Sequence, residues 1–460
     1  MHLHGQNGEN WAVFGLGRSG LSAVRALCRA GARVTAWDDR EAPRALAAGA
    51  GATIRPWREW EWKALRAVIL SPGVPFTHPV PHPMVAAARA AHVPVLGDVA
   101  LFAGVSGGRR IAAITGTNGK STATALLAHV LKRCGIPAAA GGNLGLPVLD
   151  LPELPEEGVY VIEMSSYQID LMGDLHPHVG MLLNITPDHL DRHGGFAGYA
   201  AVKERLMRRA HRAVMAIDDA PCRRILRRLV ARGGKPVTVT SGHGRGAHWH
   251  LDADWRLHQR AGGMLDIGMP SCLPGAHNRQ NVAAVFAAAR LLGAAAEDIA
   301  AALDDFPGLP HRLEEICRHD GVVFVNDSKA TNPEAAAFAL ESFENVYWIA
   351  GGRAKEGGFG HLRTALGHVR RAYLIGEAAA ELEAFCTGTL PCSRHETLDA
   401  AIAAAYEDAR NAGGGVVLLS PACASFDQFS SFEARGDRFR DQALAISAAG
   451  GHPERAGGAS

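Results

Sequence analysis

The order of apolar and polar positions predicts strands and helices that alternate along the chain. Short apolar runs that end in Gly, Pro or Asp occur four times in the first hundred residues. Segments with apolar residues at helical spacing separate these runs, which is typical of parallel strands joined by helices. The predicted strands of this part lie at residues 12–17, 33–38, 67–73 and 93–98.

The same alternation continues in a second and a third part. Residues 243–275 are rich in Gly and His and predict small antiparallel strands, and residues 278–304 predict helices. Two prolines and a glycine within residues 306–312 indicate a linker. The other predicted strands lie at residues 110–115, 159–166, 179–186, 213–218, 236–241, 322–327, 345–352, 371–376 and 416–421.

We therefore expect an α/β protein of three domains. Strands that are apolar on both faces favour sheets covered by helices on both sides. The expected domains are a Rossmann-like domain at residues 1–98, a central α/β domain at 99–308 and a second Rossmann-like domain at 309–460. From about Ala448 the tail of small and charged residues is expected to be disordered.

The first predicted strand runs into a Gly-rich turn. Gly15, Gly17 and Gly20 have the spacing G-x-G-x-x-G between a strand and a helix, and Asp38 and Asp39 end the next strand. This is the layout of a dinucleotide-binding fingerprint, which places a diphosphate at a helix N-terminus. On this turn alone, the chain is a candidate nicotinamide-dependent oxidoreductase.

Composition narrows the setting in which the protein acts. The 460 residues are 47% apolar and carry a net charge of +1, which gives no reason to expect nucleic acid or an anionic membrane as a partner. No apolar run reaches the roughly eighteen residues of a membrane span, and the N-terminus lacks the features of a signal peptide. The eight cysteines form no C-x-x-C pair. We expect a cytoplasmic protein without membrane insertion and with reduced, mostly buried thiols.

Lysine is rare in this chain, so its positions carry information. Only 7 of the 47 Lys and Arg residues are Lys. Arg is planar and always charged, whereas Lys is compact and can lose its proton. A retained Lys therefore indicates a site where a guanidinium cannot substitute.

Residues 114–122, I-T-G-T-N-G-K-S-T, predict a phosphate-binding loop. They follow a strand and open a helix, and Gly116 and Gly119 let the backbone turn so that amides converge on an anion. Lys120 is placed to reach the β- and γ-phosphates, and Ser121 to bind Mg²⁺. Ile114 stands where the full P-loop motif has its first Gly. The residues expected to bind ATP here are Gly116, Thr117, Asn118, Gly119, Lys120, Ser121 and Thr122.

Lys203 falls on the apolar face of a predicted helix. At 100° per residue, that face is formed by Phe196, Tyr199, Val202, Lys203, Leu206 and Met207. A buried ammonium is costly, so two interpretations remain open. Lys203 extends its amine to water along a packed stem, or it is a neutral amine that reacts with carbon dioxide to give an anionic carbamate. Arg could not form that carbamate.

These motifs resemble those of a known family. T-G-T-N-G-K-S-T resembles the ATP loop of the Mur ligases and folylpolyglutamate synthetases, and Y-A-A-V-K-E-R-L after D-H-L-D-R-H-G resembles the Mur ligase segment that carries a carbamylated lysine. The resemblance covers nearly the whole chain and implies ATP and Mg²⁺ as cofactors. It implies that Ser121, Glu163, His189 and carbamylated Lys203 hold the metal, and that Lys120, Glu163, His189 and Lys203 are catalytic.

The resemblance also assigns residues around the two nucleotides. It implies that Asn278, Asn281, Arg312 and Asp327 contact ATP. It places Asn143, which alone would be interpreted as a turn residue, near the phosphates and the UDP-substrate. The residues implied at the UDP-sugar end are Arg18, Ser19, Gly20, Asp38, Arg40 and Ser71.

The C-terminal part resembles one branch of the family. S-P-A-C-A-S-F-D-Q-F, at residues 420–429, is similar to the branch that adds D-glutamate, and the D-N-P-R motif of the diaminopimelate-adding branch is absent. The implied amino-acid site consists of Lys329, Thr331, Lys355, Ser425 and Phe432. Independently, Thr331 or Asn332 is predicted to cap a helix that has Pro333 near its first turn.

The resemblance implies an ATP-dependent ligase of peptidoglycan precursor synthesis. It would join D-glutamate to UDP-N-acetylmuramoyl-L-alanine through an acyl phosphate, as a monomer. A ligase for another amino acid such as L-glutamate, an oxidoreductase and an ATPase that drives a partner remain alternatives. His243, His248 and His250 lack an acid or Cys at a convincing spacing, so we expect an exposed loop there and no metal site.

Overall fold

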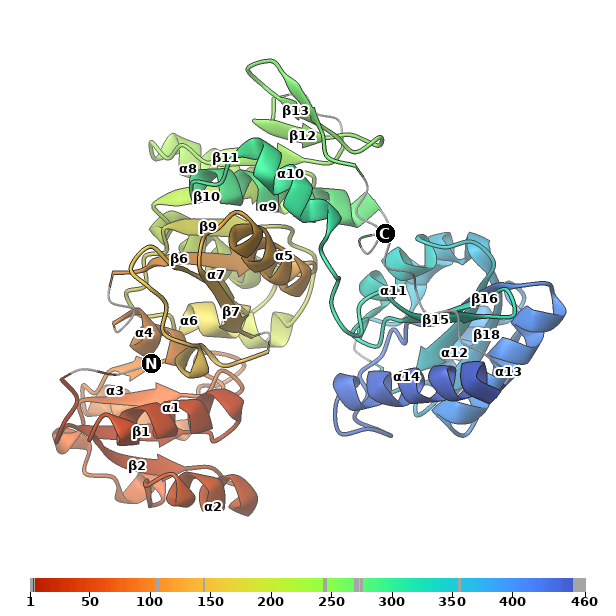
Figure 1. The fold of residues 1–460 in the computed structure, drawn as a ribbon. Coiled ribbons are helices and arrows are strands. Elements are labelled where there is room, and N and C mark those ends of the chain that lie inside the picture. Colours follow the sequence, from red (N-terminus) through yellow and green to blue (C-terminus); the bar gives the residue numbers. More distant parts are fainter. Residues whose placement is uncertain are drawn as a thin grey trace. The chain divides into compact units, whose positions relative to one another are not determined.

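The computed structural model describes residues 3, 5–104, 108–143, 145–242, 246–268, 273, 276–354 and 357–449. Packing divides the chain into two compact units. The first unit consists of residues 1–268 and 279–304, and the second of residues 269–278 and 305–460. Figure 1 follows the chain through α/β elements in both, which confirms the predicted fold class.

A Rossmann-like sheet forms the N-terminal part of the first unit. Its elements are β1 (Asn10–Phe14), α1 (Arg18–Arg29), β2 (Arg33–Trp37), α2 (Glu41–Gly49), β3 (Thr53–Ile54), β4 (Ala67–Leu70), α3 (Pro83–Ala90) and β5 (Val95–Leu96). Parallel strands lie in the order β3-β2-β1-β4-β5. Alternate residues of β1 face opposite sides: Trp11 and Val13 join one apolar cluster, and Ala12 and Phe14 join another. The sheet is therefore buried on both faces, as predicted.

The central sheet carries the phosphate loop. Its elements are α4 (Asp98–Ala103), β6 (Arg110–Thr115), α5 (Lys120–Arg133), β7 (Ala138–Gly142), β8 (Val159–Glu163), α6 (Ser166–Asp170), β9 (Val179–Leu182), α7 (Phe196–Arg209), β10 (Arg212–Ala216), α8 (Ala220–Ala231), β11 (Val237–Thr240), β12 (Trp249–Leu251), β13 (Arg256–Gln259), β14 (Met264–Asp266), α9 (Ala276–Leu291) and α10 (Ala296–Asp304). In the described part the strand order is β14-β13-β12-β11-β10-β9-β6-β8-β7. β13 and β14 are antiparallel, as predicted, while β12 extends the parallel part of the sheet.

The third sheet belongs to the second unit. Its elements are β15 (Glu314–His319), β16 (Val322–Asn326), α11 (Pro333–Leu340), β17 (Val346–Gly351), β18 (Val369–Ile375), α12 (Ala379–Cys386), β19 (Cys392–Arg394), α13 (Leu398–Asn411), β20 (Gly415–Leu419) and α14 (Phe432–Ala449). The order is β15-β16-β20-β17-β18-β19, with β15 antiparallel to β16. Trp348 of β17 packs on one face and Ile349 on the other.

The structure contains strands that the sequence did not predict. β7 has the sequence A-A-A-G-G and pairs with β8 at the edge of the central sheet. It has no β-branched residue to mark it, and Gly142 is required there because a Cβ would lie 2.4 Å from the carbonyl oxygen of Glu163. β15 was missed because its charged residues suit an edge strand rather than a buried one.

Other sequence predictions have mixed outcomes. The seven described cysteines are free, and Cys222, Cys317, Cys386 and Cys423 are buried, which agrees with the prediction; Cys272 lies outside the described residues. Among the described residues, no helix has the length and apolarity needed to cross a bilayer. The tail predicted to be disordered falls largely on residues 450–460, which lie outside the described part, and α14 extends to Ala449.

A buried arginine ties together the strand ends of the third sheet. Arg435, 1% exposed, donates from Nε to Ser328 Oγ (3.0 Å) and from Nη2 to the carbonyl oxygens of Ser328 (2.9 Å) and Cys423 (3.1 Å). Nη1 reaches the carbonyl oxygen of Gly351 at 3.4 Å. Burial lowers the pKa of Arg435 to about 10, so the guanidinium stays charged at neutral pH.

Asp327 lies beside this centre and is also buried. Its Oδ2 accepts from Ser420 Oγ (2.8 Å) and its Oδ1 from the Leu313 amide (3.4 Å). Burial raises the pKa of Asp327 to about 7, although Ser420 and Arg312 oppose the shift. The carboxyl group therefore changes its charge near neutral pH in the folded protein.

We expect Arg435→Met to destabilise the second unit by about 3 kcal/mol, because three buried carbonyl oxygens lose their charged donor. Hydrogen exchange of the amides of β16 and β20 measures the change. Arg438→Met, on the same helix but in an exposed pair with Asp399, is the control and should leave that exchange unchanged. Equal protection in the two variants would contradict the assignment.

We expect the stability of the second unit to fall as the pH rises from about 4 to about 7. The folded state holds the proton of Asp327 to a higher pH than the unfolded chain does, so stability present at low pH is lost as the group ionises. The check is the urea concentration at which the second unit unfolds, measured at pH 5 and at pH 8. Protease cleavage within residues 305–460 reports the unfolding of this unit. Asp327→Asn should show a smaller drop between the two pH values than the wild type.

Candidate active site

The carboxyl ends of four neighbouring strands define the candidate site. β9, β6, β8 and β7 are adjacent and parallel, so the loops after them emerge at one edge of the sheet. The loop after β6 is the predicted phosphate loop, Asn184 and Asn143 follow β9 and β7, and Glu163 is the last residue of β8. Ligand sites of open α/β sheets lie at this edge.

The phosphate loop is a tight turn that leads directly into α5. Gly119 has φ +79°, which other residues rarely adopt, and α5 begins at Lys120. The amine of Lys120 curls back over the loop and donates to the carbonyl oxygens of Gly116 (3.0 Å) and Thr117 (2.7 Å). Ser121 is buried and Thr122 half-buried in the first turn of the helix. The loop thus ends at the N-terminus of a helix, where backbone amides favour an anion, and the binding of phosphate there stays a prediction.

Lys203 points inward, as the helical pattern predicted. It is 1% exposed on α7, and Nζ donates to the carbonyl oxygen of Gly116 (2.8 Å) and to Thr115 Oγ1 (3.2 Å). Nζ also lies 4.6 Å from the centre of the Tyr199 ring. Burial, followed by the charge of Lys120, lowers the pKa of Lys203 well below its ordinary value. The interpretation in which the amine extends to water is therefore wrong.

Glu163 and Asn143 meet across the edge of the sheet. Asn143 Nδ2 donates to Glu163 Oε1 at 2.7 Å, and Glu163 itself is 1% exposed. Glu163 Oε2 is buried without a hydrogen-bond partner in the described structure. A buried carboxylate oxygen that lacks a donor fits a place where a cation binds.

His189 lies in the loop after β9, in the left-handed backbone region at φ 52°. Its Nε2 is 3.4 Å from Asp188 Oδ2, and its ring packs 5.1 Å from that of Tyr167. Its side chain is 42% exposed, so the imidazole can reach a ligand. Among the described residues, no three His, Cys, Asp or Glu side chains gather as a metal cage. A site on this edge would therefore need donors of other types, such as Ser121 and a modified Lys203.

Helix α9 contributes two asparagines. Asn278 and Asn281 are both buried, at 4% and 2% exposure. A Cβ on Gly119 would lie 2.4 Å from Asn281 Oδ1, so the phosphate loop passes directly against this side chain. Asn281 therefore lies next to the loop, while the predicted contacts of Asn278 and Asn281 with ATP stay a prediction.

Asn184 supports the phosphate loop and was missed in the sequence. Its Oδ1 accepts from the Asn118 amide (2.8 Å) and its Nδ2 donates to the Asn118 carbonyl oxygen (3.2 Å). Thr117 is held separately, by Tyr199 OH (3.2 Å) and by the Thr186 backbone. The signal available was a polar residue directly after an apolar strand, L-L-N-I-T, at the edge where ligands bind.

The N-terminal fingerprint folds as a tight diphosphate-type turn. A Cβ on Gly20 would lie 1.9 Å from the Gly15 carbonyl oxygen, so only glycine allows α1 to pack on the turn. Asp38 accepts from the Leu16 amide (2.7 Å) and from Arg40 (3.1 Å). Burial would raise the pKa of Asp38, but these donors hold it below its ordinary value. The carboxylate is thus committed to shaping the turn and orienting Arg40.

The other predicted UDP-side residues surround the same turn. The Ser71 amide donates to the Phe14 carbonyl oxygen (2.9 Å), and a Cβ on Gly15 would lie 2.7 Å from Ser71 Cβ. Arg18 donates from Nη2 to the Gly145 carbonyl oxygen in the loop after β7. Ser19 is half-buried next to Gly20. These residues thus lie on or next to the turn, and their contacts with a UDP-sugar stay a prediction.

In the second unit, the predicted substrate residues Lys329 and Thr331 follow β16, Ser425 follows β20, and Phe432 is the first residue of α14. The ammonium of Lys329 lies 4.0 Å from the centre of the Phe432 ring. Thr331 precedes Asn332, and it is Asn332 that caps α11, accepting from the Ala335 amide at 2.8 Å. Ser425 is buried, and Arg312 lies near Asp327. Lys355 lies outside the described residues.

His311 was not predicted and supports this group of residues. It is 6% exposed, its Nδ1 is 3.0 Å from Asn326 Nδ2, and its carbonyl oxygen accepts from the Lys329 amide (3.1 Å). A Cβ on Gly436 would lie 2.2 Å from the ring. The sequence analysis singled out the neighbouring Arg312 alone. His311 was missed because its contacts are with residues that are distant in the sequence.

In the histidine-rich segment, the rings of His248 and His250 contact different partners. His248 Nδ1 is 2.8 Å from Thr238 Oγ1, and His250 stacks on His258 at 5.6 Å. His243 lies outside the described residues. Each described ring therefore has a local structural partner.

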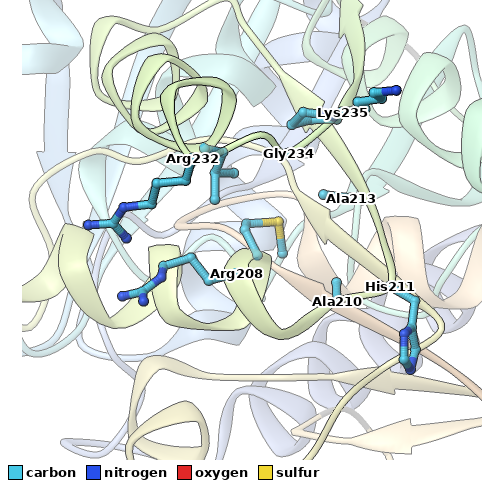
Figure 2. A pocket seen from close by; sticks show the side chains of 10 residues that line it. Arg208, Ala210, His211, Ala213, Arg232, Gly234 and Lys235 are labelled. Atoms are coloured by element: carbon cyan, nitrogen blue, oxygen red, sulfur yellow. The ribbon is translucent and has the colours of Figure 1, made fainter.

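A pocket of about 320 Å³ lies at the amino ends of β10 and β11, the edge opposite the phosphate loop (Figure 2). Arg208, His211, Arg232 and Lys235 line it above an apolar floor that includes Met207. Arg208 and Arg232 stand at the C-terminal ends of α7 and α8, where cations favour the helix dipole. The helix ends are sufficient to explain why Arg208 and Arg232 lie there. The pocket therefore gives no reason to move the candidate site away from the carboxyl edge of the sheet.

Sequence profiles match three consecutive regions of the chain. They are the Mur ligase MurD-like N-terminal domain at residues 9–97, the Mur ligase middle domain at 114–289 and the Mur ligase glutamate ligase domain at 311–423. Together they cover most of the 460 residues.

Curated relatives match over nearly their full length. UDP-N-acetylmuramoylalanine–D-glutamate ligase of Paramagnetospirillum magneticum is 48% identical over 96% of this chain and 98% of its own. The protein of that name from Caulobacter vibrioides is 45% identical, with 98% of each chain covered.

Solved structures share the fold at low identity. UDP-N-acetylmuramate-alanine ligase MurC of Thermotoga maritima superimposes with a TM-score of 0.61 at 18% identity, over 95% of this chain and 99% of that one. MurF of Acinetobacter baumannii gives 0.59 at 20% identity, over 89% and 91%. With the profiles and the curated relatives, these matches show that the chain belongs to the Mur ligase family.

Proposed function

We propose that this chain is an ATP-dependent amide ligase that joins D-glutamate to UDP-N-acetylmuramoyl-L-alanine. The observation that carries the proposal is the meeting of Lys120 and Lys203 on one carbonyl oxygen, that of Gly116 in the phosphate loop. A second, buried lysine next to the loop lysine fits a metal-assisted ATP site in which its carbamate would be a metal ligand. Relatives that cover the whole chain carry the name of this ligase.

Within this proposal, ATP first activates a carboxylate. Hydroxide is a poor leaving group, so the terminal phosphoryl group is transferred to the carboxylate of UDP-N-acetylmuramoyl-L-alanine and ADP leaves. The loop amides and the N-terminus of α5 bind the phosphates, and Lys120 moves from the loop carbonyls to the transferring group. The expected ATP residues are those of the loop, with Thr122, Asn278, Asn281, Arg312 and Asp327.

The side chains at the sheet edge suit a magnesium ion. Glu163 Oε2 is buried and lacks a hydrogen-bond partner in the described structure. Ser121, Glu163, His189 and the carbamate of Lys203 would hold Mg²⁺, which supplies charge neutralisation for the phosphoryl group. Asn143 fixes the other oxygen of Glu163 and so orients its free lone pairs.

Carbamylation follows from the environment of Lys203. Burial and the neighbouring Lys120 favour the neutral amine, whose lone pair forms a bond to the carbon of CO₂ and releases one proton. The product is an anion that resembles a carboxylate. The carbamate therefore places an anion beside the amine of Lys120, where the unmodified side chain would place a neutral amine.

The amine of D-glutamate then attacks the acyl phosphate, and phosphate leaves. The second unit supplies the amino-acid site: Lys329, Thr331, Ser425 and Phe432, with Lys355. A cation and a hydroxyl suit an amino acid with two carboxylates. The attacking amine must be uncharged. His189, whose side chain is 42% exposed, either takes up the amine proton as a base or holds the metal, because a metal-bound imidazole cannot do both.

The UDP-sugar is assigned to the N-terminal turn, with Arg18, Ser19, Gly20, Asp38, Arg40 and Ser71. The diphosphate of UDP meets the same backbone geometry that a dinucleotide would. The proposal has the enzyme act in the cytoplasm, as a monomer, on small-molecule substrates.

We expect phosphate release from ATP to require both UDP-N-acetylmuramoyl-L-alanine and D-glutamate. Each substrate is needed because the acyl phosphate forms on one and is consumed by the other. Phosphate assays with each substrate omitted, and with L-glutamate in place of D-glutamate, measure this. Phosphate release without an acceptor would favour an ATPase that drives a partner, and equal use of L-glutamate would contradict the stated stereochemistry.

We expect Lys203→Ala and Lys203→Arg to lower turnover by at least about a hundredfold. Neither side chain can form a carbamate, and the guanidinium stays charged. Turnover and the signal of ¹³CO₂-labelled carbamate in the full-length protein are the measurements. Lys132→Arg, the same change at an exposed lysine of α5, is the control. Full activity of Lys203→Arg would rule out the carbamate.

A further inference from the structure

A relay of three side chains, Asn184, Gln280 and Asp218, connects the phosphate loop to the carboxyl ends of β10 and β11. Asn184 holds Asn118 of the loop at both its amide (2.8 Å) and its carbonyl oxygen (3.2 Å). Asn184 Nδ2 also donates to Gln280 Oε1 at 3.3 Å. Gln280 Nε2 then donates to Asp218 Oδ2 at 2.6 Å. The relay lies wholly within the first unit.

The direction of every hydrogen bond in the relay is fixed by its two ends. The Asn118 amide can only donate, and the carboxylate of Asp218 can only accept. Asn184 must therefore turn its oxygen towards the loop, and Gln280 must turn its oxygen towards Asn184. Neither side-chain amide can flip without creating a donor–donor or acceptor–acceptor clash.

Asp218 is itself immobilised at the ends of β10 and β11. Its Oδ1 accepts from Thr240 Oγ1 (2.6 Å) and from the amides of Ser241 and Gly242 (3.1 Å each). A carboxylate with three donors on one oxygen resists rotation, so its other oxygen holds Gln280 in one position. The relay is thus anchored on the rigid part of the sheet.

The relay enters α9 at the turn that carries Asn278 and Asn281. Gln280 lies between them, and Asn281 packs against Gly119 of the loop. Two contacts therefore set the loop against α9: one through Asn184 to Gln280, and one through Asn281. Displacing Gln280 would disturb both.

We propose that Asn184 and Gln280 are positioning residues that hold the phosphate loop and α9 in register for ATP before ATP arrives. This rests on the proposed function, because it assigns ATP to the loop. A loop fixed in advance costs less entropy to order on binding. The relay therefore acts on ATP affinity and leaves the affinities for UDP-N-acetylmuramoyl-L-alanine and D-glutamate unchanged.

Two nearly isosteric variants test the relay. Gln280→Glu places an oxygen opposite the carboxylate of Asp218, and Asn184→Asp removes the donor to Gln280 and to the Asn118 carbonyl. We expect each to weaken MgATP binding to the full chain by about tenfold. The double variant Asp218→Asn/Gln280→Glu returns a donor to that contact and should recover most of the lost affinity. Gln259→Glu, an exposed position on β13, controls for the added charge.

Calorimetric titration with MgATP gives the dissociation constants, and initial rates give KM for each of the three substrates. Support consists of a raised dissociation constant and KM for ATP alone, with recovery in the double variant and an unchanged thermal midpoint. Wild-type ATP affinity in Gln280→Glu and Asn184→Asp would overturn the inference, as would equal losses for all three substrates. A wild type that binds MgATP but forms no ligation product would overturn the proposed function, while the ATP dissociation constants would still decide the relay.

Discussion

Two lysine amines share one carbonyl oxygen in this protein, and the chemistry of the site depends on that arrangement. Lys120 and Lys203 approach the Gly116 carbonyl oxygen at 3.0 and 2.8 Å, one from the first turn of α5 and one from the middle of α7. Two ammonium groups so close, one of them 1% exposed, repel each other in a medium that screens poorly. Burial, together with the charge of Lys120, lowers the pKa of Lys203 and so favours its neutral amine. The same residue type thus meets two environments at this loop, half-buried at Lys120 and fully buried at Lys203.

The features that the sequence predicted are those encoded by local spacing. The phosphate loop follows from the order of Gly116, Gly119 and Lys120, and the inward direction of Lys203 follows from the 3.6-residue period of its helix. The Gly15–Gly20 turn was predicted for a similar reason, since steric exclusion at Gly20 is a property of the turn itself. These predictions needed no knowledge of which segments meet in space.

The missed features depend on contacts between distant segments. Asn184 and Gln280 are 96 positions apart and meet because the residues after the end of β9 lie beside the first turns of α9. Arg435 resembles any surface arginine in the sequence, yet it ties together the ends of three strands 12 to 107 positions away. β7 escaped because alanine and glycine carry no strand signal, and its pairing with β8 supplies the stability that its side chains lack. The sequence thus predicted candidate residues where the chemistry restricts the residue type. It did not predict the residues that hold those candidates in place through contacts between distant segments.

The short β13–β14 hairpin at one end of the central sheet bears on the tendency of the protein to aggregate through that edge. A long parallel sheet ends in exposed amides and carbonyls that could pair with another molecule. Here β13 and β14 reverse direction, and the outermost strand is three residues long and ends in Asp266. An edge strand this short, with a carboxylate at its end, offers few free amides and carbonyls to a strand of another molecule. At the β14 border, the nine-stranded sheet thus offers only a short, charged edge for pairing with another molecule.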